Sequence, residues 1–202
     1  MHVINALACN LLPFDGDLYL LRSFYTTDQA DEYFANLLAN IVWQSEQLRL
    51  YGRWLTVPRL MAWYGDEGVD YRYSGLNHHP LPWTTLLHTL REDVQQACGH
   101  SFNSVLANLY RNGRDSMGCH ADDEPELGLN PQIASLSFGD TRLLRFRHPV
   151  SGKRIDIELG HGDLLWMGGT IQHHWRHELP KTRKPKHARI NLTFRHIVKL
   201  AV

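Results

Sequence analysis

The sequence predicts an α+β protein in which two helices precede a β-rich sandwich or jelly roll and cover one of its sheets. In the N-terminal half, two segments carry apolar residues at helical spacing. From Ser101 onward the period changes to two, in short runs that Gly, Pro or Asn turns separate. Helices followed by many short strands are typical of this architecture. The 202 residues, 43% hydrophobic, suffice for one core, so we expect a single domain over 1–202.

The first helix is expected over residues 26–43, where Thr26 and Gln29 stand at capping-box spacing. The second is expected over Thr84–Cys98, with Gly99 placed to end it. Each helix has one apolar stripe, which we expect to be core. These stripes are Phe34, Leu37, Leu38, Ile41 and Val42 in the first helix, and Leu87, Leu90, Val94 and Ala97 in the second.

Strands are expected at 102–110, 132–138, 141–148, 153–159, 163–167 and 188–198. In the last of these, Arg189, Asn191, Thr193 and Arg195 alternate with purely apolar residues and share one face. Two guanidinium groups on one buried face repel each other, so we expect an anion to bind between them. A carboxylate gripped by both N–H groups of a guanidinium is the simplest candidate.

Composition excludes several classes of protein. Basic and acidic residues balance at 21 each, so any nucleic-acid binding must come from local patches. The three cysteines form no Cys-x-x-Cys pair, which argues against a secreted disulfide scaffold. We find no signal peptide and no apolar run long enough to span a membrane. We therefore expect an unsecreted monomer with no membrane partner, cytoplasmic in a bacterium or nuclear in a eukaryote.

Two His-x-Asp pairs are candidates for a metal site. His161-Gly162-Asp163 is interpreted as a structural turn, because Gly162 leads directly into an apolar strand. His120-Ala121-Asp122 lies in a stretch without a core pattern, and on a strand its two side chains would face one ion. A third ligand could come from His173, His174 or His177.

Two histidines and a carboxylate leave adjacent coordination positions open, as Fe(II) requires to bind a 2-oxo acid and dioxygen together. Zinc with the same ligands would hydrolyse instead. The pair Arg189 and Arg195 favours oxidation, because hydrolysis needs no clamp for a dicarboxylate. The alternative to a metal site is that these histidines are ordinary surface residues.

An ordered set of motifs resembles the AlkB family of Fe(II)/2-oxoglutarate dioxygenases. The set comprises Asn108-Leu109-Tyr110, His120-x-Asp122, Trp166-Met167-Gly168-Gly169, a histidine before Leu179-Pro180, and Arg189-x-Asn191-x-Thr193-x-Arg195. The resemblance implies a double-stranded β-helix over 101–198 that uses Fe(II), 2-oxoglutarate and O2. It implies His120, Asp122 and His177 as metal ligands. It also implies a cosubstrate pocket of Asn108, Tyr110, Arg189, Asn191 and Arg195, in which Arg195 salt-bridges the far carboxylate.

Residues 45–80 are rich in aromatics interleaved with arginine, a pattern suited to stacking on bases and contacting phosphates. They resemble the nucleotide-recognition lid of the AlkB branch that repairs double-stranded DNA. By that resemblance Tyr73 and His120 sandwich a flipped base, Tyr71 supports it and Glu124 contacts its exocyclic nitrogen. Leu50 and Tyr51 would wedge into the duplex, and Arg59 of the Val-Pro-Arg motif would contact substrate.

The resemblance implies a DNA repair enzyme that demethylates N-alkylated bases such as 1-methyladenine and 3-methylcytosine. It would hydroxylate the N-alkyl carbon and release formaldehyde, succinate and CO2. Alkylated DNA, double- or single-stranded, is the expected partner. The same chemistry on RNA or protein is one alternative, and a non-catalytic nucleic-acid-binding module is another. The basic run Lys181, Arg183, Lys184, Lys186 and His187 is either a phosphate contact or a solvated loop.

Overall fold

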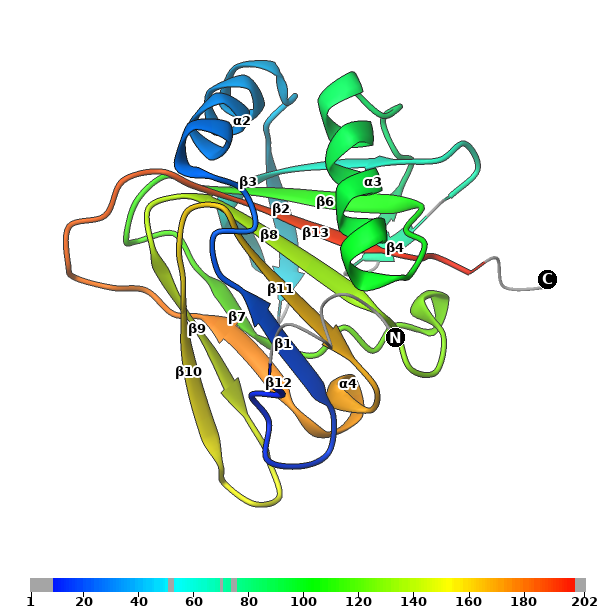
Figure 1. The fold of residues 1–202 in the computed structure, drawn as a ribbon, viewed down its shortest axis with the longest axis vertical. Helices are drawn as coiled ribbons and strands as arrows, with labels where there is room; N and C mark the ends of the chain where they lie inside the picture. Colours follow the sequence, from blue (N-terminus) through cyan, green and yellow to red (C-terminus); the bar gives the residue numbers. More distant parts are fainter. Residues whose placement is uncertain (1–8, 51–52, 70, 74–75, 199–202) are drawn as a thin grey trace.

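The computed structural model describes residues 9–50, 53–69, 71–73 and 76–198. Two antiparallel β-sheets face each other, and two helices cover the outer side of the larger sheet (Figure 1). This is the expected α+β jelly roll. No helix in the described part of the chain is long and apolar enough to cross a membrane.

The larger sheet has seven strands in the order β1-β11-β8-β13-β6-β3-β2, and the smaller has four in the order β10-β9-β12-β7. The strands of the larger sheet are, in that order, Asp17–Leu21, Asp163–Gly168, Ile133–Gly139, Arg189–Arg195, Ser104–Tyr110, Arg53–Gly65 and Gln44–Leu50. Those of the smaller sheet are Arg154–Leu159, Arg142–Arg147, Arg176–Leu179 and Met117–His120. A separate hairpin joins β4 (Tyr71–Tyr73) to β5 (Leu76–His78).

Both expected helices are confirmed. α2 (Thr27–Asn40) begins after Thr26, which forms the capping box with Gln29. α3 (Thr85–Cys98) begins after Thr84, whose side chain accepts from Leu87 N, and ends at Gly99, whose φ of 71° suits a residue without Cβ. Two shorter helices are η1 (Pro125–Leu127) and α4 (Ile171–His174).

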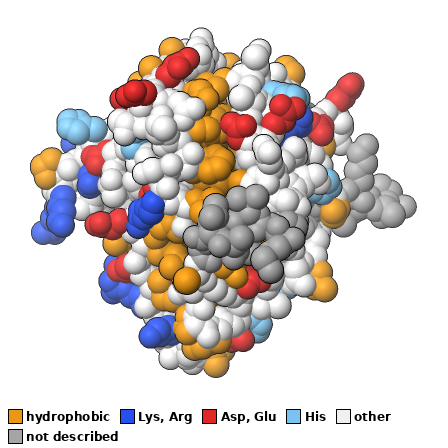
Figure 2. Space-filling view, viewed as in Figure 1, with side chains coloured by type: hydrophobic (Ala, Val, Ile, Leu, Met, Phe, Trp, Pro, Cys, Tyr) orange, Lys and Arg blue, Asp and Glu red, His pale blue; other side chains and the backbone are white. Residues whose placement is uncertain are grey.

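The apolar stripe of α2 is narrower than expected. Leu37 is buried, but Leu38 is 42% exposed, so its assignment to the core is wrong. Val42 is also exposed, because the helix ends at Asn40 and the chain then turns into an extended conformation. Figure 2 shows the apolar side chains that remain visible as a band between the two helices.

The two faces of β13 separate the core from the site. Ile190, Leu192 and Phe194 are buried under the helices in the largest apolar cluster. The alternate residues point into the space between the sheets, as the strict alternation predicted. Part of the segment expected to be a lid belongs to this sheet, because Leu60–Gly65 of β3 pair with β6.

Candidate active site

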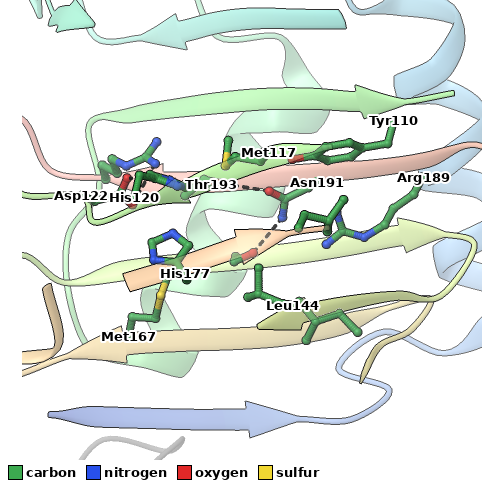
Figure 3. Close-up of a pocket in the computed structure, with 14 residues that line it drawn as sticks. Tyr110, Met117, His120, Asp122, Leu144, Met167, His177, Arg189, Asn191 and Thr193 are labelled. Carbon is green, nitrogen blue, oxygen red and sulfur yellow. Dashed lines mark hydrogen bonds and ion pairs between the residues drawn. The ribbon is translucent and has the colours of Figure 1, made fainter. Parts of the chain in front are cut away.

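Three metal-ligand side chains meet between the sheets. His120 and His177 lie directly opposite each other on β7 and β12, and their ring centroids are 4.3 Å apart. Asp122 follows two residues after His120, beyond the end of β7. One ligand atom from each residue lies within 4.8 Å of the others (Figure 3). The site thus combines one local pair with one partner 57 residues away, brought in by strand pairing.

The surroundings of the three groups favour metal binding. His120 Nδ1 is 2.9 Å from the carbonyl oxygen of Gly118, to which it can only donate, so in the neutral ring Nε2 carries the lone pair. Burial, then the neighbouring His120, lowers the pKa of His177 to about 3, and the ring is neutral at pH 7. Burial alone would raise the pKa of Asp122, but Arg195 and the histidines outweigh it and hold the pKa at about 2.

The carboxylate of Asp122 is held in one orientation. Arg195 Nη2 donates to Asp122 Oδ2 at 2.9 Å, and Asp122 Oδ1 faces His120 Nε2 at 3.6 Å. The backbone N–H of Asp122 donates to Gln172 Oε1 at 3.0 Å. Asp122 therefore offers one oxygen toward the histidines while the other is occupied by a cation.

Arg189 lies at the other end of the cavity, deep between the sheets (Figure 3). Its guanidinium lies 5.4 Å from the ring centroid of Tyr110, and Nη2 donates to Ser137 Oγ at 2.9 Å. Among the described residues, Arg189 Nε and Nη1 have no hydrogen-bond partner. Burial, then Arg142, lowers the pKa of Arg189 to about 10, so the group is still cationic at pH 7. A buried cation with two unused donors fits a carboxylate.

The two arginines of β13 lie in different surroundings, which bears on the role expected for Arg195. A 2-oxo acid that binds the metal through its oxo end places its far carboxylate away from the three ligands. Arg195 is paired with the ligand Asp122, whereas Arg189 lies at the opposite end. Arg189, whose Nε and Nη1 have no hydrogen-bond partner among the described residues, therefore has donors left for a further anion.

The wall between the two ends is formed by β13 and β6. Asn191 lines the cavity, but both of its N–H groups are used, one by Ser135 Oγ and one by Leu136 O. Its carbonyl oxygen accepts from Thr193 Oγ1 at 3.0 Å. Asn108 pairs with Asn191 in register and is fully buried. All five residues of the expected pocket thus lie on the inner face of these strands.

The other histidines serve different contacts. His161 Nδ1 accepts from the N–H of Gly139, so Nε2 carries the proton and faces Asp31. Asp163 accepts from the N–H groups of Ser23 and Gly160, which confirms its structural interpretation. His173 Nε2 lies near the carbonyl oxygen of Leu129, away from the three ligands.

A second group with metal-ligand spacing consists of Asp15, His148 and His174. His148 Nδ1 accepts from the N–H of Ser151 at 3.1 Å, so the ring proton is on Nε2, which faces Asp15 Oδ2 at 3.1 Å. A neutral imidazole in this tautomer has no lone pair left for a metal on the Asp15 side. We interpret this group as a structural contact.

Most expected nucleic-acid contacts lie outside the described residues. Tyr51 falls in an undescribed segment, and the side chains of Leu50, Tyr71 and Tyr73 are likewise not described. Glu124 is half-buried and comes two residues after Asp122, just before η1.

Arg59, which the sequence analysis expects to contact substrate, lies inside the protein. Its side chain is 4% exposed, and Nε donates to Asn108 Oδ1 at 2.7 Å, inside the protein. Residues that sequence reasoning missed are Gln172, Ser137 and Arg142. Arg142 donates to the carbonyl oxygens of Asn112, Asp115 and Pro180. None of these stands in a pattern that distinguishes it from an ordinary polar residue.

Comparison with known proteins agrees with this geometry. Residues 17–195 match the model of the 2OG-Fe(II) oxygenase superfamily. The chain is 39% identical to the Mus musculus protein named DNA oxidative demethylase ALKBH2, over 96% of this chain and 82% of that protein. For the Homo sapiens protein of the same name, the identity is 40% over 96% of this chain and 75% of that protein.

A second group of relatives carries another name. The chain is 40% identical to the Bos taurus protein named alpha-ketoglutarate-dependent dioxygenase alkB homolog 3, over 88% of this chain and 65% of that protein. Among solved structures, that of OsALKBH1 matches with a TM-score of 0.60 at 21% identity. It covers 89% of this chain and 97% of that one, a likeness of fold.

Proposed function

The chain belongs to the 2OG-Fe(II) oxygenase superfamily, and from that premise we propose that it is a dioxygenase that removes N-alkyl groups from DNA bases. Its cofactors are Fe(II), 2-oxoglutarate and O2. The single observation that carries the proposal is the pairing of a two-histidine, one-carboxylate cluster with a buried arginine whose two unused donors face the same cavity. The names of the relatives point to alkylated DNA as the substrate.

His120, Asp122 and His177 would hold the iron, and Arg189 with Tyr110 would hold the far carboxylate of 2-oxoglutarate. Iron and the oxo acid together supply the oxidant that hydroxylates a C–H bond with O2, and the acid leaves as succinate and CO2. Arg195 keeps Asp122 ionised and turned toward the histidines. The apolar residues Met117, Leu144 and Met167 line the same cavity and limit the entry of water.

A hydroxylated N-methyl group is a hemiaminal, which breaks down to formaldehyde and the unmodified base. No side chain has to act as a nucleophile on the base. Bases such as 1-methyladenine and 3-methylcytosine carry a positive charge, and the acidic residues Asp123 and Glu124 next to the ligand Asp122 suit a cationic substrate. Glu124 would contact the base, and Tyr71 and Tyr73 would stack on it.

The test measures formaldehyde released from matched single- and double-stranded oligonucleotides that contain 3-methylcytosine. Release should require both Fe(II) and 2-oxoglutarate, and His120→Ala should abolish it while DNA binding is retained. His161→Ala is the matched control, because this histidine belongs to the other His-x-Asp pair and should leave the release unchanged. Equal release by the wild type and His120→Ala would refute the metal assignment.

The same site chemistry would serve RNA or a protein side chain, and the assay separates these candidates. An iron-loaded protein that consumes 2-oxoglutarate with methylated RNA, but not with methylated DNA, would move the substrate to RNA. Lack of turnover with every polymer would leave a nucleic-acid-binding module. We propose a monomer acting in the compartment that holds DNA, the bacterial cytoplasm or the eukaryotic nucleus.

A further inference from the structure

The paired strands β2 (Gln44–Leu50) and β3 (Arg53–Gly65), called the arm below, contain a bulge in β3. Ser45 pairs with Leu60 and Gln47 pairs with Thr56, so Glu46 alone stands opposite residues 57–59. Pro58 lies within this segment and has no N–H to donate to a ladder. Such a bulge redirects side chains relative to a regular strand. Here Arg59, the last residue of the bulge, is buried between the sheets.

Arg59 determines which way the amide of Asn108 points. Arg59 Nε donates to Asn108 Oδ1 at 2.7 Å, and a guanidinium can only donate. The oxygen of the amide must therefore face Arg59, and the NH2 group must face away from it. Asn108 Nδ2 is buried and has no hydrogen-bond partner among the described residues. A buried donor without a partner costs stability, which is characteristic of a site that awaits a ligand.

Asn108 stands on the inner face of β6, two residues from Tyr110 and opposite Asn191 of β13. Tyr110 and Asn191 both line the cavity between the metal ligands and Arg189. The neighbouring amide of Asn191 cannot serve as a donor, because its two N–H groups are already used within the sheet. The unused N–H groups of Asn108 are thus the amide donors left on this wall in the described part of the chain.

The same bulge also contacts the strand that carries His120. The N–H of Ser116 donates to the carbonyl oxygen of Pro58 at 3.0 Å. Arg59 Nη1 in turn donates to the carbonyl oxygen of Ser116 at 3.4 Å. Ser116 immediately precedes β7, which ends at His120. Residues 57–59 therefore contact both the cosubstrate wall and the start of the ligand strand.

We propose that Arg59 is a positioning residue that holds the Asn108 amide with its N–H groups toward 2-oxoglutarate, so that an arm residue sets the affinity for the cosubstrate. This inference rests on the proposed function, because it needs 2-oxoglutarate to bind between the sheets. It replaces the substrate contact expected for Arg59 with a role inside the protein. The arm and the cosubstrate pocket then share one residue.

The test is a calorimetric titration of the Mn(II)-loaded protein with 2-oxoglutarate, without DNA or turnover. Arg59→Met should weaken binding about tenfold or more, the effect of losing a positioned hydrogen bond to a charged ligand. Arg59→Lys can still donate to Asn108 Oδ1 and should restore most of the affinity. Arg91→Met is the matched control: it removes a half-buried guanidinium from α3, away from the cavity, and should leave the affinity unchanged.

A double-mutant cycle separates positioning from general support of the fold. If Arg59 acts through the amide, Arg59→Met should weaken binding no further in the Asn108→Ala background. If the losses of 2-oxoglutarate affinity in the two single variants multiply in the double variant, the proposal is overturned. A loss of affinity below twofold for Arg59→Met alone would also overturn it. Melting temperatures of all variants report any loss of stability separately.

Asn108→Asp tests the orientation without changing Arg59, in case Arg59→Met does not fold. If the N–H groups of Asn108 point at the ligand, Asn108→Asp puts an anionic oxygen in their place. That oxygen repels a carboxylate, so this variant should bind 2-oxoglutarate more weakly than Asn108→Ala. Equal or tighter binding than Asn108→Ala would contradict it. Failure of the proposed function has a different result, because the wild-type protein itself would then show no metal-dependent binding of 2-oxoglutarate.

Discussion

At the scale of single residues, the hydrogen bond made by Nδ1 distinguishes the candidate metal ligand His120 from His161 and His148. His120 donates through Nδ1 to a carbonyl oxygen, which leaves Nε2 for a metal. His161 and His148 accept through Nδ1 from backbone N–H groups, which puts the proton on Nε2. The sequence contains His-x-Asp twice, and spacing alone does not separate the two. The hydrogen-bond partner of Nδ1 separates them, and this partner is a backbone group outside the His-x-Asp motif or set by the local turn.

The two arginines of β13 should fail in different ways when replaced. Arg189→Met removes the two unused buried donors, and we expect affinity for 2-oxoglutarate to fall about 100-fold or more, while Mn(II) affinity hardly changes. Arg195→Met removes the partner of Asp122, and we expect it to lower the affinity for Mn(II) more than Arg189→Met does. Calorimetric titration with each ligand measures both. The opposite pattern would show that the roles of the two arginines are exchanged.

The three thiols should differ in reactivity. Burial raises the pKa of Cys98 to about 12, and its side chain is fully enclosed, whereas Cys9 and Cys119 are exposed. We expect iodoacetamide at pH 8 to label Cys9 and Cys119 in the folded protein and Cys98 only after unfolding. Mass spectrometry of peptides reads out the labelled positions. Rapid labelling of Cys98 in the folded protein would contradict its place in the core.

At the scale of elements, the ligand positions depend on the two shortest strands of the smaller sheet. β7 and β12 have four residues each, which is too short for a period-two pattern to indicate a strand. The longer strands β6, β8 and β13 are buried almost throughout, and they fall within the runs predicted at 102–110, 132–138 and 188–198. The His120–His177 contact depends on the register of β7 against β12, which the resemblance could imply but local pattern could not.

Alkaline pH should loosen the contact between α3 and the segment before α2. Burial, together with the hydrogen bond that Tyr25 donates to Asp93, raises the pKa of Tyr25 above its usual value near 10. A folded-state pKa above the unfolded one means that this stability is fully present below about pH 10 and is lost as pH rises further. We expect the urea midpoint of the wild type to fall between pH 10 and 11.

The matched variant is Tyr25→Phe, which keeps the ring contacts in the core. It should be less stable by about 1 kcal/mol at pH 7, since it loses one hydrogen bond, and its urea midpoint should fall less above pH 10. Parallel curves for the two proteins would mean that Tyr25 does not carry this alkaline dependence.

At the scale of the whole molecule, two sheets with one shared inner space explain why residues far apart in sequence form one site. The architecture follows from the alternation of strands such as β13 and from the capped helices, both readable in the sequence. The burial of Arg59 was not readable, because the three-residue bulge that turns it inward depends on the pairing of β2 with β3. Likewise Gln172 reaches Asp122 only through the short turn of α4.

Because the charges of the whole chain balance, any salt dependence of DNA binding must come from local basic patches. Basic and acidic residues are equal in number, and Figure 2 shows Lys and Arg side chains gathered at the edge where Figure 1 places the β12–β13 loop. Replacing Lys181, Arg183 and Lys184 by alanine should lower the slope of log affinity against log salt by up to about 0.9 for each lost phosphate contact. Fluorescence anisotropy with labelled duplex DNA measures the slope.

Lys186→Ala in the same loop is the control, because the ammonium of Lys186 is already paired with Asp140 at 3.0 Å. It should leave the slope nearly unchanged. An unchanged slope for the triple variant would assign the loop to solvent instead of DNA.

The six-residue separation of Arg189 and Arg195 bears on the length of the oxo acid. Their Cα atoms lie about 20 Å apart along an extended strand, with one guanidinium at each end of the cavity. Side chains alternate between the faces, so Arg189 could move along β13 only in steps of two residues, about 7 Å. Such a step is far larger than the roughly 1.5 Å of one carbon–carbon bond. Sliding the strand therefore cannot adapt the pocket to a homologous acid with one carbon more or less; only exchange of the side chains at its ends can.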